Sequence, residues 1–418
     1  MNRTSKHILK YQTGSKTNWL DKLFDDYRLE VEAYIDLILQ GKIPLQALYT
    51  ANKIQKVSFD LTLWQVTACS HASSLIMKSK KNAEMNRTRI YKRLYAKCKS
   101  LKIHQKFLDK HFHELRLNPI LESKWFKRPK LKNITIFFNK LISNIHEDSK
   151  HFDMFVKVVL PYRDPKYKNR GIALKLPIQN YSYAKKKFKS WKRKDTVTIR
   201  KDEKGRYFLN FFYEKDAPEI RKTGKEIGFD QGYHKLFSDS EGNHYGRGLE
   251  NIYKKLENKK RGSKKYRGLL IHKKQEINRV VNSLPLEDVQ HVVIESLKYV
   301  KHNSKINRRV SSQTMNKMQY WSYRQATGKL ENICEENGIL LTKVIASYTS
   351  QTCSNCGIVD GDNRSGEHYH CSHCGLDIDA DYNAAINILR RGRIDPMDRV
   401  TNLGSEKGIV VKNNTLFQ

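Results

Sequence analysis

The sequence lacks any long apolar segment. No run of about 18 consecutive apolar residues occurs in the 418-residue chain, which excludes a membrane-spanning helix of ordinary length. The N-terminus, MNRTSKHILKYQ, also lacks the apolar core of a secretion signal. We therefore expect a protein that stays in the cytoplasm, associated with the nucleoid of a prokaryotic cell.

Acidic residues and cysteines are both scarce. Aspartate and glutamate number 43 against 79 lysines and arginines, which gives a net charge of +36. Such an excess repels itself unless it meets a polyanion, so nucleic acid is the expected partner and a membrane surface the weaker alternative. Three of the seven cysteines, Cys69, Cys98 and Cys334, stand alone in the sequence. This pattern favours a reducing compartment over a disulfide framework.

The other four cysteines form two C-x-x-C knuckles, in the segments CSNCG and CSHCG. Two such turns direct four thiolates to one point and predict a structural zinc site at Cys353, Cys356, Cys371 and Cys374. Four unrelated buried thiols are the alternative interpretation. Three nearby histidines are either replacement ligands or surface residues: His368, His370 and His373.

Helical periodicity dominates the first part of the chain. Apolar residues recur at helical spacing over 18–40, and a second helical region follows over 45–77, with Trp64 as its largest side chain. Over 78–132 lysine and arginine are interleaved with aromatic residues. This composition favours contact with phosphates and some base stacking, although a solvated basic helix face is the alternative.

An alternating pattern replaces the helical one after Pro129. The segments around 155–159, 172–176 and 197–213 predict an antiparallel barrel or sheet, with a hairpin turn at 201–205. The lysine-rich stretch 185–194 is either a phosphate-facing edge or a solvated loop. This module is predicted to bind and not to catalyse.

The C-terminal part mixes strands and helices. A strand ends at Asp230, a helical hairpin turns near 261–264, and a buried strand over 289–294 ends at Glu295. A helix over 313–337 and a strand over 339–345 precede the knuckles. The basic stretch 298–309 and the tail after 393 have the composition of flexible segments.

Three carboxylates stand out by their positions. Asp230 and Glu295 each end an apolar strand, and Asp381 opens a helical segment directly after the second knuckle. Burying such groups singly is costly, but the cost falls where carboxylates converge on divalent cations. Two Mg²⁺ ions held this way would serve a nuclease, with the zinc segment as a lid beside its centre. Taken singly, each acid is also explained as a turn cap, an ion pair or a helix N-cap.

Four motifs in order, IGFDQG, VVIES, the paired knuckles and DADYNAAINI, resemble the split RuvC-like nuclease of transposon-encoded TnpB and of miniature type V CRISPR effectors. The resemblance covers about 223–392. It implies an RNase H-like sheet in which Asp230, Glu295 and Asp381 are the first, second and third catalytic acids, with Asp377 and Asp379 less favoured as the third. It also places Arg364, in GDNRSG, near the scissile phosphate; a surface arginine of the zinc loop is the alternative. Gln231 departs from the family pattern, which has an apolar residue there.

The predicted fold is an α+β multidomain chain. By the resemblance, it consists of a helical recognition lobe over 1–132 (whose first residues join the next module), a wedge-like β-barrel over 133–222, an RNase H-like nuclease over 223–346 and 381–396, an inserted four-cysteine zinc ribbon over 347–380, and a tail over 397–418.

The function that the resemblance implies is an RNA-guided DNA endonuclease of the TnpB type. Its partners would be a guide RNA and target double-stranded DNA next to a short flanking motif, and it would act as a monomer. A miniature type V effector is the nearest alternative, followed by a nuclease-inactive RNA-guided regulator. A transposase or Holliday-junction resolvase of the same fold and a plain zinc-ribbon nucleic-acid-binding protein explain fewer of the residues.

Overall fold

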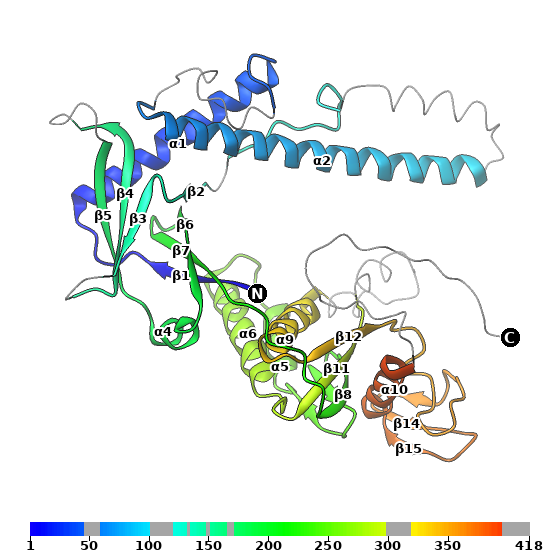
Figure 1. Cartoon of the computed structure of the whole chain (residues 1–418). Coiled ribbons are helices and arrows are strands. Elements are labelled where there is room, and N and C mark those ends of the chain that lie inside the picture. Colours follow the sequence, from blue (N-terminus) through cyan, green and yellow to red (C-terminus); the bar gives the residue numbers. More distant parts are fainter. Residues whose placement is uncertain are drawn as a thin grey trace. The chain divides into compact units, whose positions relative to one another are not determined.

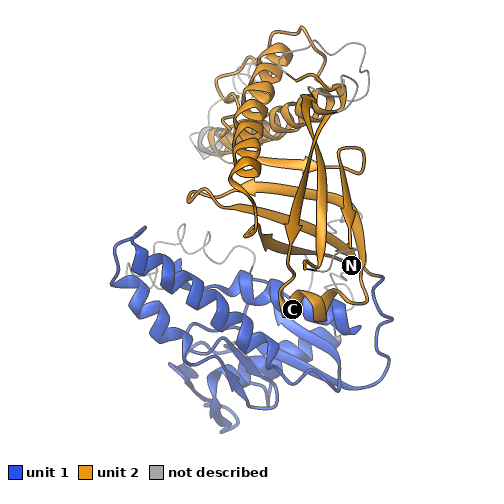
Figure 2. Cartoon of the chain, turned by 90° about the vertical axis from the view of Figure 1, so that its left-hand side faces the viewer, with its two compact units in different colours: residues 1, 216–418 blue, residues 2–215 orange. Residues whose placement is uncertain are grey.

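The computed structural model describes residues 1–45, 59–100, 120–131, 134–147, 151–164, 171–297 and 319–394. They form two compact units, an N-terminal unit of residues 2–215 and a C-terminal unit of residues 216–418, to which Met1 also counts (Figure 2). Several predicted segments lie outside the described residues: 46–58, 101–119 with Phe107 and Phe112, the start of the helix predicted from 313, the basic stretch 298–309 and the tail over 397–418.

The N-terminal unit combines helices with two antiparallel sheets (Figure 1). One sheet has the strand order β1-β7-β6-β2 and the other β3-β4-β5. The first strand of the chain pairs along its length with β7. The elements are β1 (Asn2–Ile8), α1 (Gly14–Leu39), α2 (Thr62–Ser100), β2 (Thr135–Phe138), β3 (Ser143–His146), β4 (Met154–Arg163), β5 (Gly171–Ile178), α4 (Ser182–Phe188), β6 (Lys192–Lys201) and β7 (Tyr207–Glu214).

Of the two predicted alternatives, a β-barrel or an antiparallel sheet, the described strands form sheets and not a closed barrel. Within the described residues the strands of the N-terminal unit form two separate open sheets, and no strand closes either sheet on itself. Alternating apolar residues predict strands, but closure depends on pairing between the first and last strands of one sheet. Here α1, α2 and strands of both sheets contribute to a single hydrophobic core.

Trp64 on α2 is central to this core. The side chain is buried, and its indole N–H donates to the carbonyl oxygen of Val159 on β4 at 2.9 Å. Tyr27 on α1, Phe59 and Phe138 on β2 contact its ring edge-on, with centroids 5.9–6.2 Å apart. The tryptophan thus joins both long helices to the strands.

A mixed sheet forms the centre of the C-terminal unit. Its strand order is β10-β9-β8-β11-β12, with β8, β11 and β12 parallel and β9 and β10 antiparallel to their neighbours. Residues of α5, α6 and α9 pack on one face in a common hydrophobic core. The elements are β8 (Lys225–Asp230), β9 (Phe237–Asp239), β10 (His244–Tyr245), α5 (Leu249–Glu257), α6 (Lys264–Asn282), β11 (Val289–Glu295), α9 (Tyr323–Asn337), β12 (Leu340–Val344) and α10 (Ala380–Ile394).

Helix α10 packs on the other face of this sheet, and two glycines set its distance. A Cβ on Gly228 of β8 would lie 2.4 Å from the carbonyl oxygen of Ala385 in α10. A Cβ on Gly392 of α10 would lie 2.6 Å from the side chain of Val293 on β11. Both values are far below van der Waals contact, so the helix can approach the strands this closely only with glycine at both positions.

A small three-stranded sheet lies between β12 and α10 in the chain. It has the order β13-β14-β15, with β13 (Arg364–Ser365), β14 (His368–His370) and β15 (Asp377–Asp379) all antiparallel. The two knuckles flank β13 and β14. None of the described helices is long and apolar enough to cross a membrane.

We predict that Gly228→Ala destabilises the C-terminal unit. The added methyl group forces α10 away from β8, and overpacking of this kind costs about 1–3 kcal/mol. Denaturant unfolding measured by circular dichroism checks the effect. Gly268→Ala is the matched control, because Gly268 lies in α6 with open space around its Cβ position and alanine favours helix. Equal stability of the two variants would contradict the close approach of α10.

Candidate active site

Two of the predicted acids end neighbouring parallel strands. Asp230 is the last residue of β8 and Glu295 the last of β11, and the register pairs Phe229 with Ile294 directly before them. Side chains alternate between the faces of a sheet, so Asp230 shares a face with Gly228 and Glu295 shares one with Val293. Both of those residues contact α10. The two carboxylates therefore lie on the side of the sheet that α10 covers.

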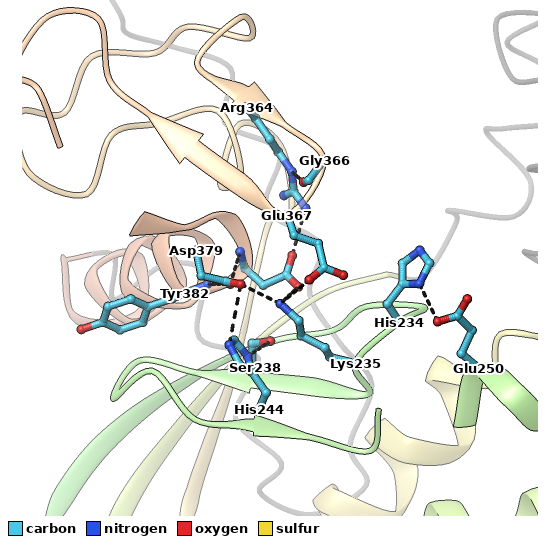
Figure 3. Close-up of polar contacts among 11 residues, drawn as sticks. His234, Lys235, Ser238, His244, Glu250, Arg364, Gly366, Glu367, Asp379 and Tyr382 are labelled. Atoms are coloured by element: carbon cyan, nitrogen blue, oxygen red, sulfur yellow. Dashed lines mark hydrogen bonds and ion pairs between the residues drawn. The ribbon is translucent and has the colours of Figure 1, made fainter. Parts of the chain in front are cut away.

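Asp381 completes the group from the first turn of α10. The residue is 9% exposed, and its Oδ1 accepts a hydrogen bond from the Arg364 guanidinium on β13 at 2.9 Å. The arginine also donates from Nε to the carbonyl oxygen of Gly366 at 3.2 Å (Figure 3). The charges of Glu295, Asp381 and Arg364 all act on Asp230, so the four predicted residues lie near one another in the C-terminal unit.

The electrostatics of the two strand-end acids reflect their crowding. Burial, together with the charges of Glu295 and Asp381, raises the pKa of Asp230 well above its ordinary value. Burial also raises the pKa of Glu295, although hydrogen bonds with Thr349 and Asp230 offset part of the rise. Carboxylates that repel each other in a desolvated position are stabilised by a cation. Their oxygen donors suit a hard divalent ion.

Two hydrogen bonds that the sequence did not predict hold the carboxylate of Glu295 in place. The hydroxyl of Thr349 donates to Glu295 Oε1 at 2.8 Å, and the side-chain amide of Asn387 donates to the carbonyl oxygen of Thr349 at 3.1 Å. Asn387 and Asn383 on α10 also donate to the carbonyl oxygen of Thr352. The two asparagines of DYNAAIN therefore hold the first knuckle segment against α10. Their spacing, four residues apart in an otherwise apolar helical segment, is the sequence signal that could have found them.

The neighbouring acids Asp379 and Asp377 have other contacts. Asp379 Oδ1 accepts the backbone N–H groups of Asp381 and Tyr382 at 2.9 and 3.0 Å, which caps the start of α10. Its Oδ2 accepts a hydrogen bond from Lys235 at 2.7 Å. Asp377 is exposed and pairs with His368 and His370 at 3.2 and 3.4 Å. Asp379 thus caps a helix and Asp377 forms surface ion pairs, whereas Asp381 accepts a hydrogen bond from Arg364.

Gln231, the departure from the expected apolar residue, is buried beside Asp230. Its Oε1 accepts a hydrogen bond from the hydroxyl of Thr327 on α9 at 3.0 Å. The turn that follows is closed by a hydrogen bond from the Gly232 N–H to the Lys235 carbonyl oxygen at 3.1 Å. The Thr327 hydroxyl therefore satisfies the Oε1 of Gln231, whereas its buried Nε2 has no hydrogen-bond partner among the described residues.

The four knuckle cysteines form one cluster, with all four Sγ atoms within 4.8 Å of one another. Cys353 and Cys374 are 3.6 Å apart and Cys356 and Cys371 3.7 Å. A tetrahedron with metal–sulfur distances of about 2.3 Å has edges of about 3.8 Å, so the cluster can hold zinc. The backbone N–H of Leu376 lowers the pKa of the Cys374 thiol to about 6, whereas burial and hydrogen bonds with the other three thiols raise the pKa of Cys356 to about 12. The histidines considered as replacement ligands are not in this cluster.

A cleft of about 700 Å³ opens beside Glu295 within the C-terminal unit. It lies between α9 and β12, and its lining includes Arg324 and Lys343 as well as Glu295 itself. Lys343 is paired with Glu331 across the cleft. The cleft gives access to one of the converging acids.

The basic regions of the N-terminal unit differ in how many of their charges are paired. In the stretch 185–194, Lys185 pairs with Asp153, Arg193 with Glu147, and Lys192 and Lys194 with Glu214. Much of that charge therefore serves the fold. On α2, Tyr91 and Tyr95 stack with centroids 6.0 Å apart, beside exposed Lys92 and Arg93.

Fold and site together define a mixed α/β protein in which a four-cysteine cluster adjoins converging acids. Residues 323–388 match the family described as Cas12f1-like, TNB domain. Over 72 residues the chain is 44% identical to the CRISPR-associated endodeoxyribonuclease Cas12f1 of Sulfoacidibacillus thermotolerans, covering 17% of each chain. Over 132 residues it is 30% identical to a TnpB-like protein of Acanthamoeba polyphaga mimivirus, covering 32% of this chain and 25% of the relative.

A similar solved structure is a cryo-EM structure of a Cas12f1–sgRNA–target DNA complex. It has 16% identity and a TM-score of 0.44, and the alignment covers 93% of this chain and 98% of the other. The sequence matches confirm the predicted resemblance to TnpB and to miniature type V effectors. The chain matches only about a sixth to a quarter of the length of these curated relatives.

We predict that the purified chain carries about one zinc ion and that Cys371→Ser removes it, because three thiolates hold zinc less well than four. Elemental analysis by mass spectrometry measures the zinc content. Cys334→Ala is the control, since Cys334 is a buried thiol of α9 outside the cluster. A Cys371→Ser protein that keeps its zinc would contradict the assignment.

Proposed function

We propose that the chain is an RNA-guided DNA endonuclease of the TnpB and miniature type V kind, with one RuvC-like centre. The observation that carries the proposal is the convergence of Asp230, Glu295 and Asp381 from two strand ends and a helix start. The match of residues 323–388, which include Asp381, to the Cas12f1-like family model supports it, as do the similarities to a Cas12f1 endodeoxyribonuclease and to a TnpB-like protein.

In this proposal the C-terminal unit is an RNase H-like nuclease interrupted by residues 347–380. We call this segment, which carries both C-x-x-C knuckles, the knuckle domain. The mixed sheet with parallel β8, β11 and β12 and helices on both faces supports that assignment. The knuckle domain would be a four-cysteine zinc ribbon that binds target nucleic acid. The N-terminal unit would serve as the recognition lobe and wedge that hold the guide RNA and read the flanking DNA motif.

Asp230, Glu295 and Asp381 would hold the divalent cations, most simply two Mg²⁺ ions, because Asp230 and Glu295 are buried as neighbours and the charge of Asp381 acts on Asp230 as well. The chemistry that such a bound pair supplies is activation of water and stabilisation of the leaving oxygen of a phosphodiester. Thr349 keeps Glu295 oriented for this task through its 2.8 Å hydrogen bond. The cleft beside Glu295 would admit the DNA strand, with Arg324 on its wall facing the phosphates.

Nucleic-acid binding would rest on the net charge of +36 and on exposed cations near stacked aromatic rings. The guide would pair with one DNA strand, while the protein contacts its backbone and the flanking duplex. We favour a TnpB-type protein acting as a monomer in the cytoplasm, with a miniature CRISPR effector as the second candidate.

We predict that Asp230→Ala and Glu295→Ala each lower DNA cleavage at least about 100-fold, because the site loses a charged ligand. Binding of guide RNA and target DNA should persist, since the loss of a carboxylate removes no cation that could contact a phosphate. Cleavage of a labelled duplex in Mg²⁺ with the RNA that copurifies measures the first effect, and gel shift the second.

Glu257→Ala is the control for these variants, because Glu257 is an exposed acid at the end of α5. Wild-type cleavage by either acid variant would refute the catalytic assignment. A wild-type protein that binds target DNA and leaves it intact would instead support a nuclease-inactive regulator. Sequencing of the copurified RNA distinguishes a transposon end from a CRISPR array as its source.

We also predict that Arg364→Ala slows cleavage about 100-fold at saturating target DNA. A preorganised cation beside the reacting phosphate typically contributes that much to the rate. Single-turnover cleavage measures the effect, and Arg279→Ala is the control because Arg279 lies on α6 in an exposed pair with Glu276. If the Arg364 variant loses target binding and keeps its single-turnover rate, the arginine belongs to the DNA-binding surface instead.

A further inference from the structure

Lys235 is a buried lysine to which the proposed reaction assigns no role. It lies in the turn between β8 and β9, and its side chain is only 2% exposed. An ammonium group is costly to bury without partners, since it loses its hydration. Burial alone lowers the pKa of Lys235, but hydrogen bonds and charges of Asp379 and Asp381 outweigh it, so the pKa is raised. The lysine is therefore held charged at this position.

Three carboxylates surround its ammonium group. Lys235 Nζ lies 2.7 Å from Asp379 Oδ2, 3.3 Å from Asp381 Oδ2 and 3.4 Å from Glu367 Oε2. Figure 3 shows Lys235 pointing toward Glu367 and Asp379. Glu367 belongs to the knuckle domain, next to β14, whereas Asp379 and Asp381 flank the start of α10. One side chain of the β8–β9 turn thus joins three segments.

Its contact with Asp379 fixes the first turn of α10. Asp379 uses its other oxygen to cap the helix through the N–H groups of Asp381 and Tyr382. A displacement of Asp379 would therefore move the backbone of Asp381 with it. His244 Nε2 lies 3.7 Å from the same Asp379 Oδ2 and adds a second contact from β10.

The contact with Asp381 fixes that carboxylate directly. Its Oδ1 faces Arg364 at 2.9 Å and its Oδ2 faces Lys235 at 3.3 Å, so two cations hold the two oxygens. The lysine comes from the turn that directly follows the strand carrying Asp230. It thereby ties the helix-borne acid to a strand-borne one.

We propose that Lys235 is a positioning residue that sets the orientation of Asp381 and couples the knuckle domain to the cation-binding acids. This inference rests on the proposed function and deepens it. The lysine touches neither substrate nor cation; it acts through Asp381 and Asp379. A lysine with a purely structural role would affect stability alone, whereas a positioning lysine also sets cation affinity and cleavage rate.

The test compares Lys235→Met with Lys235→Arg in the full chain with its copurified RNA. Methionine keeps the length and apolar stem but removes the charge, and arginine restores the charge. We expect Lys235→Met to weaken Mn²⁺ binding, measured by calorimetry, about 10-fold or more, and to slow single-turnover cleavage about 10- to 100-fold, with target binding unchanged. Lys235→Arg should recover most of both losses.

Lys225→Met is the matched control, because Lys225 lies at the start of β8 in an exposed ion pair with Glu241 at 3.0 Å. The double variant Lys235→Met with Asp379→Asn removes one charge of each sign. It serves if the single variant does not fold, and the same losses are expected of it, since Asp381 still lacks its lysine.

Unchanged or tighter Mn²⁺ binding in the methionine variants would overturn the proposal, as would wild-type cleavage or a failure of arginine to rescue. A wild-type chain that binds Mn²⁺ but never cleaves would refute the proposed nuclease while the Mn²⁺ comparison still decides the role of Lys235. A loss of thermal stability alone, with cation binding intact, would leave Lys235 a structural residue and the proposal wrong.

Discussion

The close packing of α10 against the mixed sheet is the constraint on which the site depends. Glycines at 228 and 392 let the helix backbone reach the strands where any Cβ would collide. Because side chains alternate along a strand, Asp230 and Glu295 then face the same helix. Asp381 enters the group only because α10 begins at the ends of these strands. A helix displaced by the width of a methyl group would leave the acids without a common centre.

The knuckle domain is attached to this centre by polar contacts instead of by a large apolar core. Asn383 and Asn387 of α10 hold backbone carbonyls of the first knuckle segment, and Arg364 reaches from β13 to Asp381. The four thiols close the domain on itself, and three of them belong to a small hydrophobic cluster around Tyr369. Metal binding at the knuckles would therefore influence the geometry of the acids, since Thr349 and Arg364 both belong to this segment of the chain.

The N-terminal unit shows why composition alone overstates a binding surface. Its lysine-rich stretch over 185–194 forms ion pairs with Asp153, Glu147 and Glu214, so several of its charges balance acids on neighbouring strands. The stacked Tyr91 and Tyr95 of α2, by contrast, lie among exposed cations. Exposure and pairing separate charges that support the fold from charges that are free to meet phosphates.

Elements with strong local signals could be predicted from the amino-acid sequence alone. The C-x-x-C pairs specified the thiol cluster, because each knuckle is a short turn with fixed geometry. Apolar periodicity placed α1, the hairpin of β6 and β7, and the strands that end at Asp230 and Glu295. Other features became visible only in the folded chain: the N-terminal sheets stay open, Asn387 and Thr349 support Glu295, and Lys235 contacts Asp379 and Asp381. These features join residues far apart in the chain, and no local pattern encodes which distant side chain will lie opposite a given strand end.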